Sequence, residues 1–243
     1  MHYTSVLFDL DGTLLDTLGD LTAAMNRTLT RHGLPERTRQ QMRAALGNGA
    51  RRLMELSVPA GTDGALFETL LAEYNADYAA HCRIETAPYP GVAALLLKLH
   101  AQGRKLAIVS NKPDEAVRAL RAAAAAANVL LLAVSALVTR GRPGPVRALY
   151  LLNAPSYNIG TFVLPFVQSF LPPDMLLAAM VQLGAERTST VYVGDSEVDI
   201  ATARAAGLPC ISVLWGFRDR DVLERAGAQQ FAADIAQLQA LLG

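Results

Sequence analysis

An apolar run that ends at two acids and a glycine constrains this chain more than any other feature. Residues 6–8 are typical of a buried strand. Asp9 and Asp11 follow one residue apart, so in an extended chain both side chains point to the same side. Gly12 then allows the backbone to turn away sharply. In an open α/β sheet ligands bind at the carboxyl ends of the strands, so we expect a site here.

Two carboxylates this close repel each other unless a cation lies between them or one takes a proton. A hard divalent ion favours such oxygen ligands, and a carboxylate left partly free can attack phosphorus. The alternative is a solvated acidic turn. An EF-hand calcium loop is excluded, because its twelfth position holds Asp20 and its fifth holds Thr13.

A second polar segment follows the predicted core strand 105–109. Ser110 and Asn111 would lie at the carboxyl end of that strand, beside a helix that the sequence predicts to begin at residues 113–115. A hydroxyl, an amide and a helix amino terminus together favour phosphate binding. The alternative is an ordinary helix cap.

A third acidic segment follows the predicted strand 190–193. Asp195 comes directly after Gly194, and Asp199 lies four residues later, where both acids can share one face of the first helical turn. Acids are also favoured at helix starts by the helix dipole, which is the alternative interpretation. Together with Asp9 and Asp11, we expect Asp195 to be a further metal-facing carboxylate.

Three segments resemble motifs of one known family, in the family's order. Residues 8–17 resemble the first motif of the haloacid dehalogenase-like hydrolases, residues 109–113 the second and residues 193–200 the fourth. The resemblance is closest to the phosphoglycolate phosphatase-like branch. It covers roughly residues 1–121 and 172–243.

The resemblance implies an α/β fold with a doubly wound, parallel, Rossmann-like core. Residues 17–85 have helical periodicity throughout and lie between two α/β segments, which is typical of an inserted helical cap. We therefore expect a core of residues 1–16 and 86–243 and a cap of residues 17–85. Such a cap excludes water from a phosphoryl-transfer site when it closes.

The resemblance also implies roles for individual residues. Asp9 would be the nucleophile and Asp11 the acid and base. Mg²⁺ would be held by the Asp9 carboxylate, the Asp11 carbonyl and Asp195, with Asp199 ordering its water shell. The transferring phosphoryl group would be bound by Gly12, Thr13, Ser110 and Asn111.

A glycine-containing segment of the predicted cap is a candidate substrate loop. Backbone amides near Asn48 and Gly49, together with Arg51 or Arg52, would reach a substrate carboxylate, although an ordinary interhelical turn is the alternative. No lysine lies between residues 14 and 89. The cap therefore cannot supply the Schiff-base amine that related phosphonate hydrolases would need.

The block 122–171 does not match the family, and the lysine of the third motif is missing. Phe170 stands near its expected place, and Arg142 is a possible substitute cation, although a planar guanidinium is not equivalent to an ammonium. An insertion, a grafted segment and a shifted reading frame all remain open. Loss of this lysine would lower the rate by about 10²–10³, judged from other lost transition-state donors.

Composition limits the partners. Lys and Arg total 22, as do Asp and Glu, so no overall charge favours nucleic acid or an anionic membrane. Cys82 and Cys210 are isolated, which favours free thiols in a reducing compartment. No secretory signal is recognisable at the amino terminus. We expect a soluble cytoplasmic protein, either monomer or homodimer.

These observations predict a Mg²⁺-dependent phosphomonoester hydrolase that acts through an aspartyl-phosphate, on 2-phosphoglycolate or a similarly small phosphate ester. Two alternatives remain open. The chain is a catalytically impaired phosphate-binding or interaction module if the missing lysine is essential, or a sugar phosphomutase of the same fold.

Overall fold

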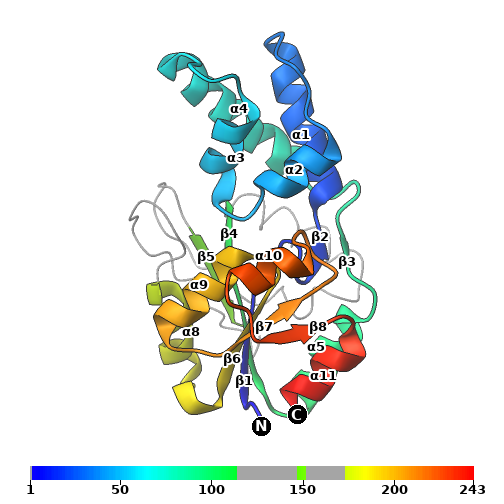
Figure 1. The fold of residues 1–243 in the computed structure, drawn as a ribbon, viewed down its shortest axis with the longest axis vertical. Coiled ribbons are helices and arrows are strands. Elements are labelled where there is room, and N and C mark those ends of the chain that lie inside the picture. The colour runs from blue at the N-terminus through cyan, green and yellow to red at the C-terminus, as the bar shows by residue number, and fades with distance from the viewer. Residues whose placement is uncertain (1, 114–146, 152–172) are drawn as a thin grey trace.

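The computed structural model describes residues 2–113, 147–151 and 173–243 (Figure 1). The helix predicted from residues 113–115 onward, the candidate cation Arg142 and Phe170 lie outside these residues, apart from Pro113.

A six-stranded sheet forms the centre of the molecule, in the order β5-β4-β1-β6-β7-β8. The strands are β1 (Ser5–Phe8), β4 (Lys105–Pro113), β5 (Arg147–Leu151), β6 (Thr190–Gly194), β7 (Cys210–Val213) and β8 (Gln230–Ala232). All neighbours are parallel except β5, which runs antiparallel to β4 at the sheet edge. The parallel core is confirmed, and the antiparallel edge strand was not predicted. Such an edge is common on otherwise parallel sheets.

Alternation along β1 directs side chains to both faces of the sheet. Val6 and Phe8 pack into one buried cluster and Leu7 into the other. Helices α5 (Val92–Ala101) and α11 (Ile235–Leu242) cover the first face. The second face is covered by α8 (Pro173–Leu183) and α9 (Glu197–Ala206), as Figure 1 shows. Burial on both faces explains why the strands are apolar without alternating polar residues.

Four helices, which we call the helical unit, lie beyond the carboxyl ends of the parallel strands (Figure 1). They are α1 (Leu18–Arg31), α2 (Arg39–Ala45), α3 (Gly49–Ser57) and α4 (Gly64–His81). A capping box between Thr38 and Gln41 begins α2, and the Asp63 carboxylate caps α4. The helical periodicity predicted across residues 17–85 thus corresponds to these four helices.

The chain enters and leaves the helical unit at one place. Strand β2 (Leu15–Asp16) pairs antiparallel with β3 (Ala87–Pro88). Nearby, the Asp20 carboxylate accepts hydrogen bonds from three successive backbone N–H groups, those of Ile84, Glu85 and Thr86, at 2.9–3.1 Å. The two linking segments are therefore held to each other, and the returning segment is also held to α1.

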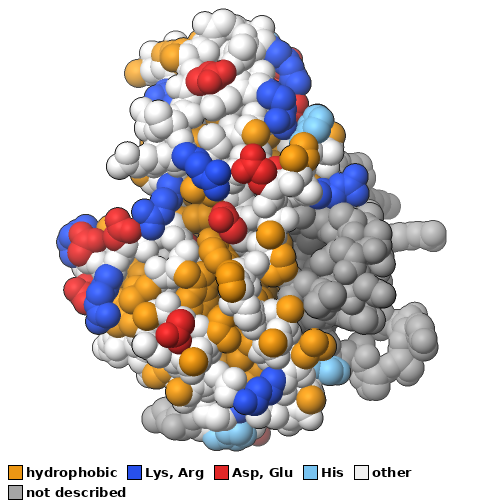
Figure 2. Space-filling model, turned by 90° about the vertical axis from the view of Figure 1, so that its right-hand side faces the viewer, with side chains coloured by type: hydrophobic (Ala, Val, Ile, Leu, Met, Phe, Trp, Pro, Cys, Tyr) orange, Lys and Arg blue, Asp and Glu red, His pale blue; other side chains and the backbone are white. Residues whose placement is uncertain are grey.

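The described surface carries mixed charge. On the face in Figure 2, basic and acidic side chains are interspersed, with no broad patch of one sign. Among the described residues no helix has the length and apolar character needed to span a bilayer.

Candidate active site

A pocket lies between the carboxyl ends of β1, β4 and β6 and the helical unit. Its polar and glycine lining is Asp9, Asp11, Gly47, Gly49, Ser110, Lys112, Asp195, Ser196, Asp199 and Arg218, and its apolar and aromatic lining is Leu21, Leu46, Ala50, Leu53, Tyr74, Tyr78 and Phe217. Residues from the first, second and fourth sequence motifs therefore converge on one space. The helical unit supplies most of the apolar wall.

Three carboxylates form the acidic centre of this pocket. One oxygen from each of Asp9, Asp195 and Asp199 lies within 4.8 Å of the others. The Asp9 N–H donates to the Val193 carbonyl at 2.9 Å, which continues the pairing of β1 with β6 and places Asp9 beside Asp195. Burial, and then repulsion from Asp199, Asp195 and Asp11, raises the pKa of Asp9 well above its ordinary value.

Asp195 is held from two sides. The backbone N–H of Phe217 donates to its Oδ2 at 2.6 Å, and the Thr13 hydroxyl donates to its Oδ1 at 3.4 Å. Gly12 has φ +86°, and a Cβ there would lie 2.4 Å from Asp195 Oδ2. The glycine thus permits both the turn and the close approach. Burial and the charge of Asp199 raise the pKa of Asp195 to about 7.

Asp199 has both carboxylate oxygens in hydrogen bonds. Its Oδ2 accepts from the backbone N–H groups of Asp195 and Ser196 and from the Ser196 hydroxyl, at 2.7–3.1 Å. Its Oδ1 accepts from the Tyr192 hydroxyl at 3.1 Å. The bond from the Ser196 N–H, together with the Asp199 N–H donating to the Ser196 hydroxyl at 3.4 Å, forms the capping box of α9, and the bond from the Asp195 N–H fixes the backbone that carries Asp195. Asp199 is therefore placed to orient Asp195.

The acidic centre fits a divalent cation. Asp9 and Asp195 offer hard oxygen atoms from two neighbouring strands, in a buried space where three carboxylates repel one another. A dication between them would offset that repulsion, whereas an uncompensated cluster must bind protons.

Asp11 faces a different partner. Its Oδ1 accepts a hydrogen bond from the Lys112 ammonium at 2.7 Å, and the same ammonium donates to the Tyr78 hydroxyl. Lys112 is 3% exposed at the end of β4, and Tyr78 comes from α4. Asp9 and Asp11 therefore line one pocket, as predicted, but Asp9 belongs to the acidic cluster and Asp11 to an ion pair.

The remaining predicted phosphate contacts fall into two groups. Ser110 is buried and lines the pocket, and its Oγ accepts from the Lys112 N–H at 3.3 Å. Asn111 lies next to it in β4, which runs to Pro113 instead of ending at residue 109. Gly12 and Thr13 are not among the lining residues. Both instead lie against the Asp195 carboxylate, to which the Thr13 hydroxyl donates a hydrogen bond.

Only part of the predicted substrate loop lines the pocket. Gly49 lines the pocket, while Asn48 is exposed at the start of α3. The Arg51 guanidinium makes two hydrogen bonds to the Glu68 carboxylate, at 2.9 and 2.8 Å, and lies over the Phe67 ring. Arg51 is thus held at the surface of the helical unit and does not line the pocket.

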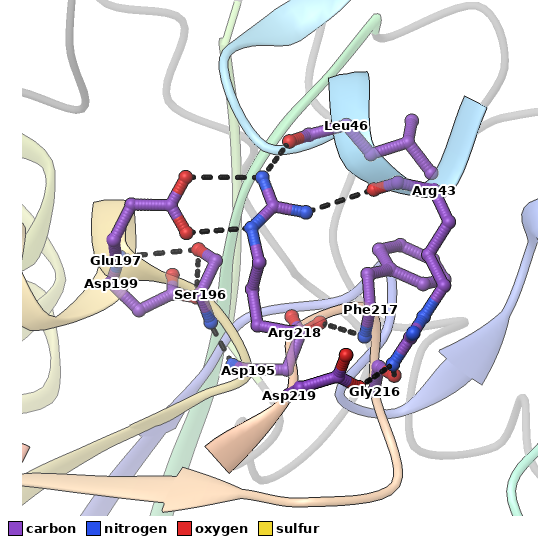
Figure 3. A network of polar contacts seen from close by, with 10 residues as sticks. All are labelled: Arg43, Leu46, Asp195, Ser196, Glu197, Asp199, Gly216, Phe217, Arg218 and Asp219. Atoms are coloured by element: carbon purple, nitrogen blue, oxygen red, sulfur yellow. Dashed lines mark hydrogen bonds and ion pairs between the residues drawn. The ribbon is translucent and has the colours of Figure 1, made fainter. Parts of the chain in front are cut away.

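Arg218 joins the two parts of the molecule beside the pocket (Figure 3). Its guanidinium pairs with Glu197 at 2.7 Å and donates to the carbonyls of Arg43 and Leu46 in the helical unit, at 2.8 and 2.6 Å. Arg43 in turn donates to the Gly216 carbonyl at 3.2 Å. The loop that carries Phe217, and through it Asp195, is thereby tied to the helical unit.

Sequence reasoning did not assign a role to Lys112, Tyr78 or Arg218. A signal existed for Lys112, since it lies two residues after Ser110 in an extended segment and so points to the same side. No local pattern marks Tyr78 or Arg218, whose positions depend on how the helical unit packs.

Comparisons with known proteins identify the family of this chain. The family model for haloacid dehalogenase-like hydrolases matches residues 3–207. The chain belongs to the haloacid dehalogenase-like hydrolase family.

Relatives within the haloacid dehalogenase-like hydrolase family carry phosphatase names. A phosphoglycolate phosphatase of Xanthomonas campestris pv. campestris is 33% identical over 214 residues, which cover 88% of this chain and 84% of that protein. An N-acetylmuramic acid 6-phosphate phosphatase of Pseudomonas aeruginosa is 29% identical over 218 residues, which cover 89% and 84%.

A solved structure of a provisionally assigned phosphoglycolate phosphatase from Lactobacillus delbrueckii subsp. bulgaricus has a TM-score of 0.79 at 29% identity, and the match covers 100% of this chain and 99% of that one. The predicted membership of the family, its α/β fold and the assignment to phosphatases are confirmed.

Proposed function

We propose that this protein is a Mg²⁺-dependent phosphomonoester hydrolase that acts through an aspartyl-phosphate on Asp9. The observation that carries the proposal is the placement of Asp9 and Asp195 within one acidic cluster, while Asp11 lines the same pocket outside that cluster. An acidic cluster for a cation, a carboxylate nucleophile and a separate acid–base group are the parts that phosphoryl transfer through a carboxylate requires.

In the first step a carboxylate oxygen of Asp9 forms a bond to phosphorus as the bond to the leaving oxygen breaks. Asp11 gives its proton to that leaving oxygen. In the second step Asp11 takes a proton from water as the water oxygen attacks phosphorus, which releases phosphate and restores Asp9. Ser110, and Asn111 beside it, would donate to the phosphoryl oxygens.

Mg²⁺ would be held by the carboxylates of Asp9 and Asp195 and by the Asp11 carbonyl, with Asp199 orienting Asp195. When bound, it would neutralise charge on the phosphoryl group. We further propose residues 17–85 as a cap and residues 1–16 and 86–243 as the core. The pocket between them is consistent with a cap that excludes water during transfer.

The proposed substrate is 2-phosphoglycolate or a similarly small phosphate ester. The names of the relatives support this class, and they also include a phosphatase for a larger sugar phosphate. A panel of esters should therefore run from 2-phosphoglycolate to hexose phosphates. The predicted cytoplasmic location and the choice between monomer and homodimer stay predictions.

The Asp9→Asn variant tests the proposal, because the amide cannot act as nucleophile. Phosphate release should require Mg²⁺ and should fall by at least about 10³-fold in the variant, as expected when a covalent nucleophile is removed. Asp221→Asn is the control, since this exposed acid pairs with Arg225 within α10 (Arg220–Arg225) and does not line the pocket. Unchanged release in Asp9→Asn would remove the nucleophile assignment.

The same panel separates the two alternative functions. Binding of phosphate esters by calorimetry without turnover would support an impaired binding module. Movement of phosphate within a hexose, without release to water, would support a phosphomutase.

A further inference from the structure

Lys112 is a buried cation next to the proposed acid–base carboxylate. Its ammonium lies 2.7 Å from Asp11 Oδ1 and 4.6 Å from the centre of the Tyr78 ring, and it also donates to the Tyr78 hydroxyl. Only 1% of the Lys112 side chain is exposed, against 22% for Asp11. Burying an ammonium is costly unless a carboxylate and further hydrogen bonds compensate, and here both are present.

Lys112 is also the cation best placed for the chemistry. Among the described residues that line the pocket, Lys112 and Arg218 alone carry positive charge. The Arg218 guanidinium is engaged by the Glu197 carboxylate and by two carbonyls of the helical unit. Lys112 instead contacts the side chain proposed to transfer the proton.

We propose that Lys112 is a positioning residue that orients Asp11 for proton transfer and stabilises the negative charge that this transfer leaves on the Asp11 carboxylate. The proposal rests on the proposed function. With the ammonium bound to Oδ1, Asp11 presents Oδ2 as the oxygen that carries the proton. As that proton passes to the leaving oxygen and the bond from phosphorus breaks, the new carboxylate charge forms beside the ammonium and is stabilised.

Tyr78 makes this arrangement depend on the helical unit. The tyrosine lies in α4, stacked on Tyr74 with ring centres 6.1 Å apart, whereas Lys112 lies in β4 and Asp11 in the segment that follows β1. The ammonium is therefore held between a cap side chain and a core carboxylate. The contact is complete only when the helical unit is seated over the sheet.

The test compares two esters that differ in their need for a proton. An alkyl phosphate has a poor leaving group that requires the acid, whereas p-nitrophenyl phosphate leaves largely without one. In Lys112→Met, kcat/KM should fall by about 10²-fold for the alkyl ester and by less than about fivefold for p-nitrophenyl phosphate, since acid catalysis is typically worth 10²–10⁴. The control is Lys98→Met, an exposed lysine on α5.

Tyr78→Phe serves as a second variant, because it removes one hydroxyl and keeps the ring and the ammonium. It should show a smaller loss with the same preference for the alkyl ester, whether or not Lys112→Met folds. Equal losses for both esters in either folded variant would overturn the inference while the proposed function stands. Failure of the unaltered chain to hydrolyse either ester would overturn both.

Discussion

Arg218 and Arg43 link the sheet and the helical unit by two hydrogen bonds that run in opposite directions. Arg218 Nη1 donates to the Arg43 carbonyl at 2.8 Å, and Arg43 Nη2 donates to the Gly216 carbonyl at 3.2 Å (Figure 3). Arg43 also pairs with the Asp219 carboxylate at 2.9 Å. The segment that orients Asp195 is thus braced against the helical unit.

Arg218→Met should weaken the attachment of the helical unit to the segment that orients Asp195. The change leaves Glu197 and two carbonyls without their charged donor, which should cost about 1.5–3 kcal/mol in the seating of the helical unit. Hydrogen exchange at residues 43–46 should become faster, and KM for a phosphate ester should rise. Arg220→Met is the control, because Arg220 is exposed and pairs within its own helix with Glu224. Unchanged exchange in Arg218→Met would contradict the role.

Mg²⁺ should stabilise the folded chain. A cation bound by Asp9 and Asp195 relieves their repulsion and binds the folded state alone, so at 10–100 times its Kd it should add about 1.4–2.7 kcal/mol. Thermal melts with EDTA and with MgCl₂ measure the shift. Asp195→Asn should lose the Mg²⁺-dependent shift, whereas Glu224→Gln, an exposed acid, should keep it. A full shift in Asp195→Asn would place the cation elsewhere.

Gly12→Ala should lower the affinity for Mg²⁺ in addition to straining the backbone. The new Cβ would lie 2.4 Å from Asp195 Oδ2, and φ is +86°, so the carboxylate must move. Gly33→Ala is a matched control, because Gly33 has φ +66° and nothing within 4 Å of its Cβ position. Both variants should lose about 1 kcal/mol of stability from the left-handed backbone. Only Gly12→Ala should need a higher Mg²⁺ concentration for half-maximal activity, as titration would reveal.

Acid should destabilise the helical unit through Asp77. Burial alone would raise the pKa of Asp77, but hydrogen bonds from Arg27 and Arg31, at 2.5–2.9 Å, outweigh it and lower the pKa. Because the folded-state pKa lies below the unfolded value of about 3.9, the stabilisation is present above that pH and is lost as pH falls through the lowered pKa. His81 faces the same carboxylate at 3.5 Å.

Asp77→Asn should therefore cost about 1.5–3 kcal/mol at pH 7 and flatten the fall in stability below pH 4. Urea melts from pH 3 to pH 7 measure both effects. Asp221→Asn, which removes an exposed pair with Arg225, should leave the profile nearly unchanged. If stability falls equally steeply with acid in Asp77→Asn, other carboxylates are responsible for the loss of stability below pH 4.

Predictions from local pattern succeeded where a rule of sheet geometry applied. Asp9 and Asp195 each follow an apolar strand, and the carboxyl ends of adjacent parallel strands meet at one edge, so their convergence was predictable. The engagement of Asp199 in the α9 capping box was less accessible, because a serine and an acid three residues apart can cap a helix or face a ligand.

Predictions were weakest where long-range packing decides the outcome. Arg51 was predicted to reach the substrate, but Glu68, seventeen residues later, holds it at the surface. The sequence does not reveal the role of Lys112, because that role depends on Asp11 and Tyr78, which are distant in sequence and contact Lys112 only in the folded chain. The antiparallel edge strand β5 lies within the block that resembles no familiar pattern.

The pairing of β2 with β3 gives the helical unit the geometry of an exchangeable module. Asp16 and Ala87 are register partners, so the points of departure and return are roughly 5 Å apart. A segment of any size whose ends are that close can be spliced between them without altering the strand order behind it. A different inserted segment could thus replace the helical unit while the residues at the ends of the strands stay unchanged, which would give an enzyme of new selectivity.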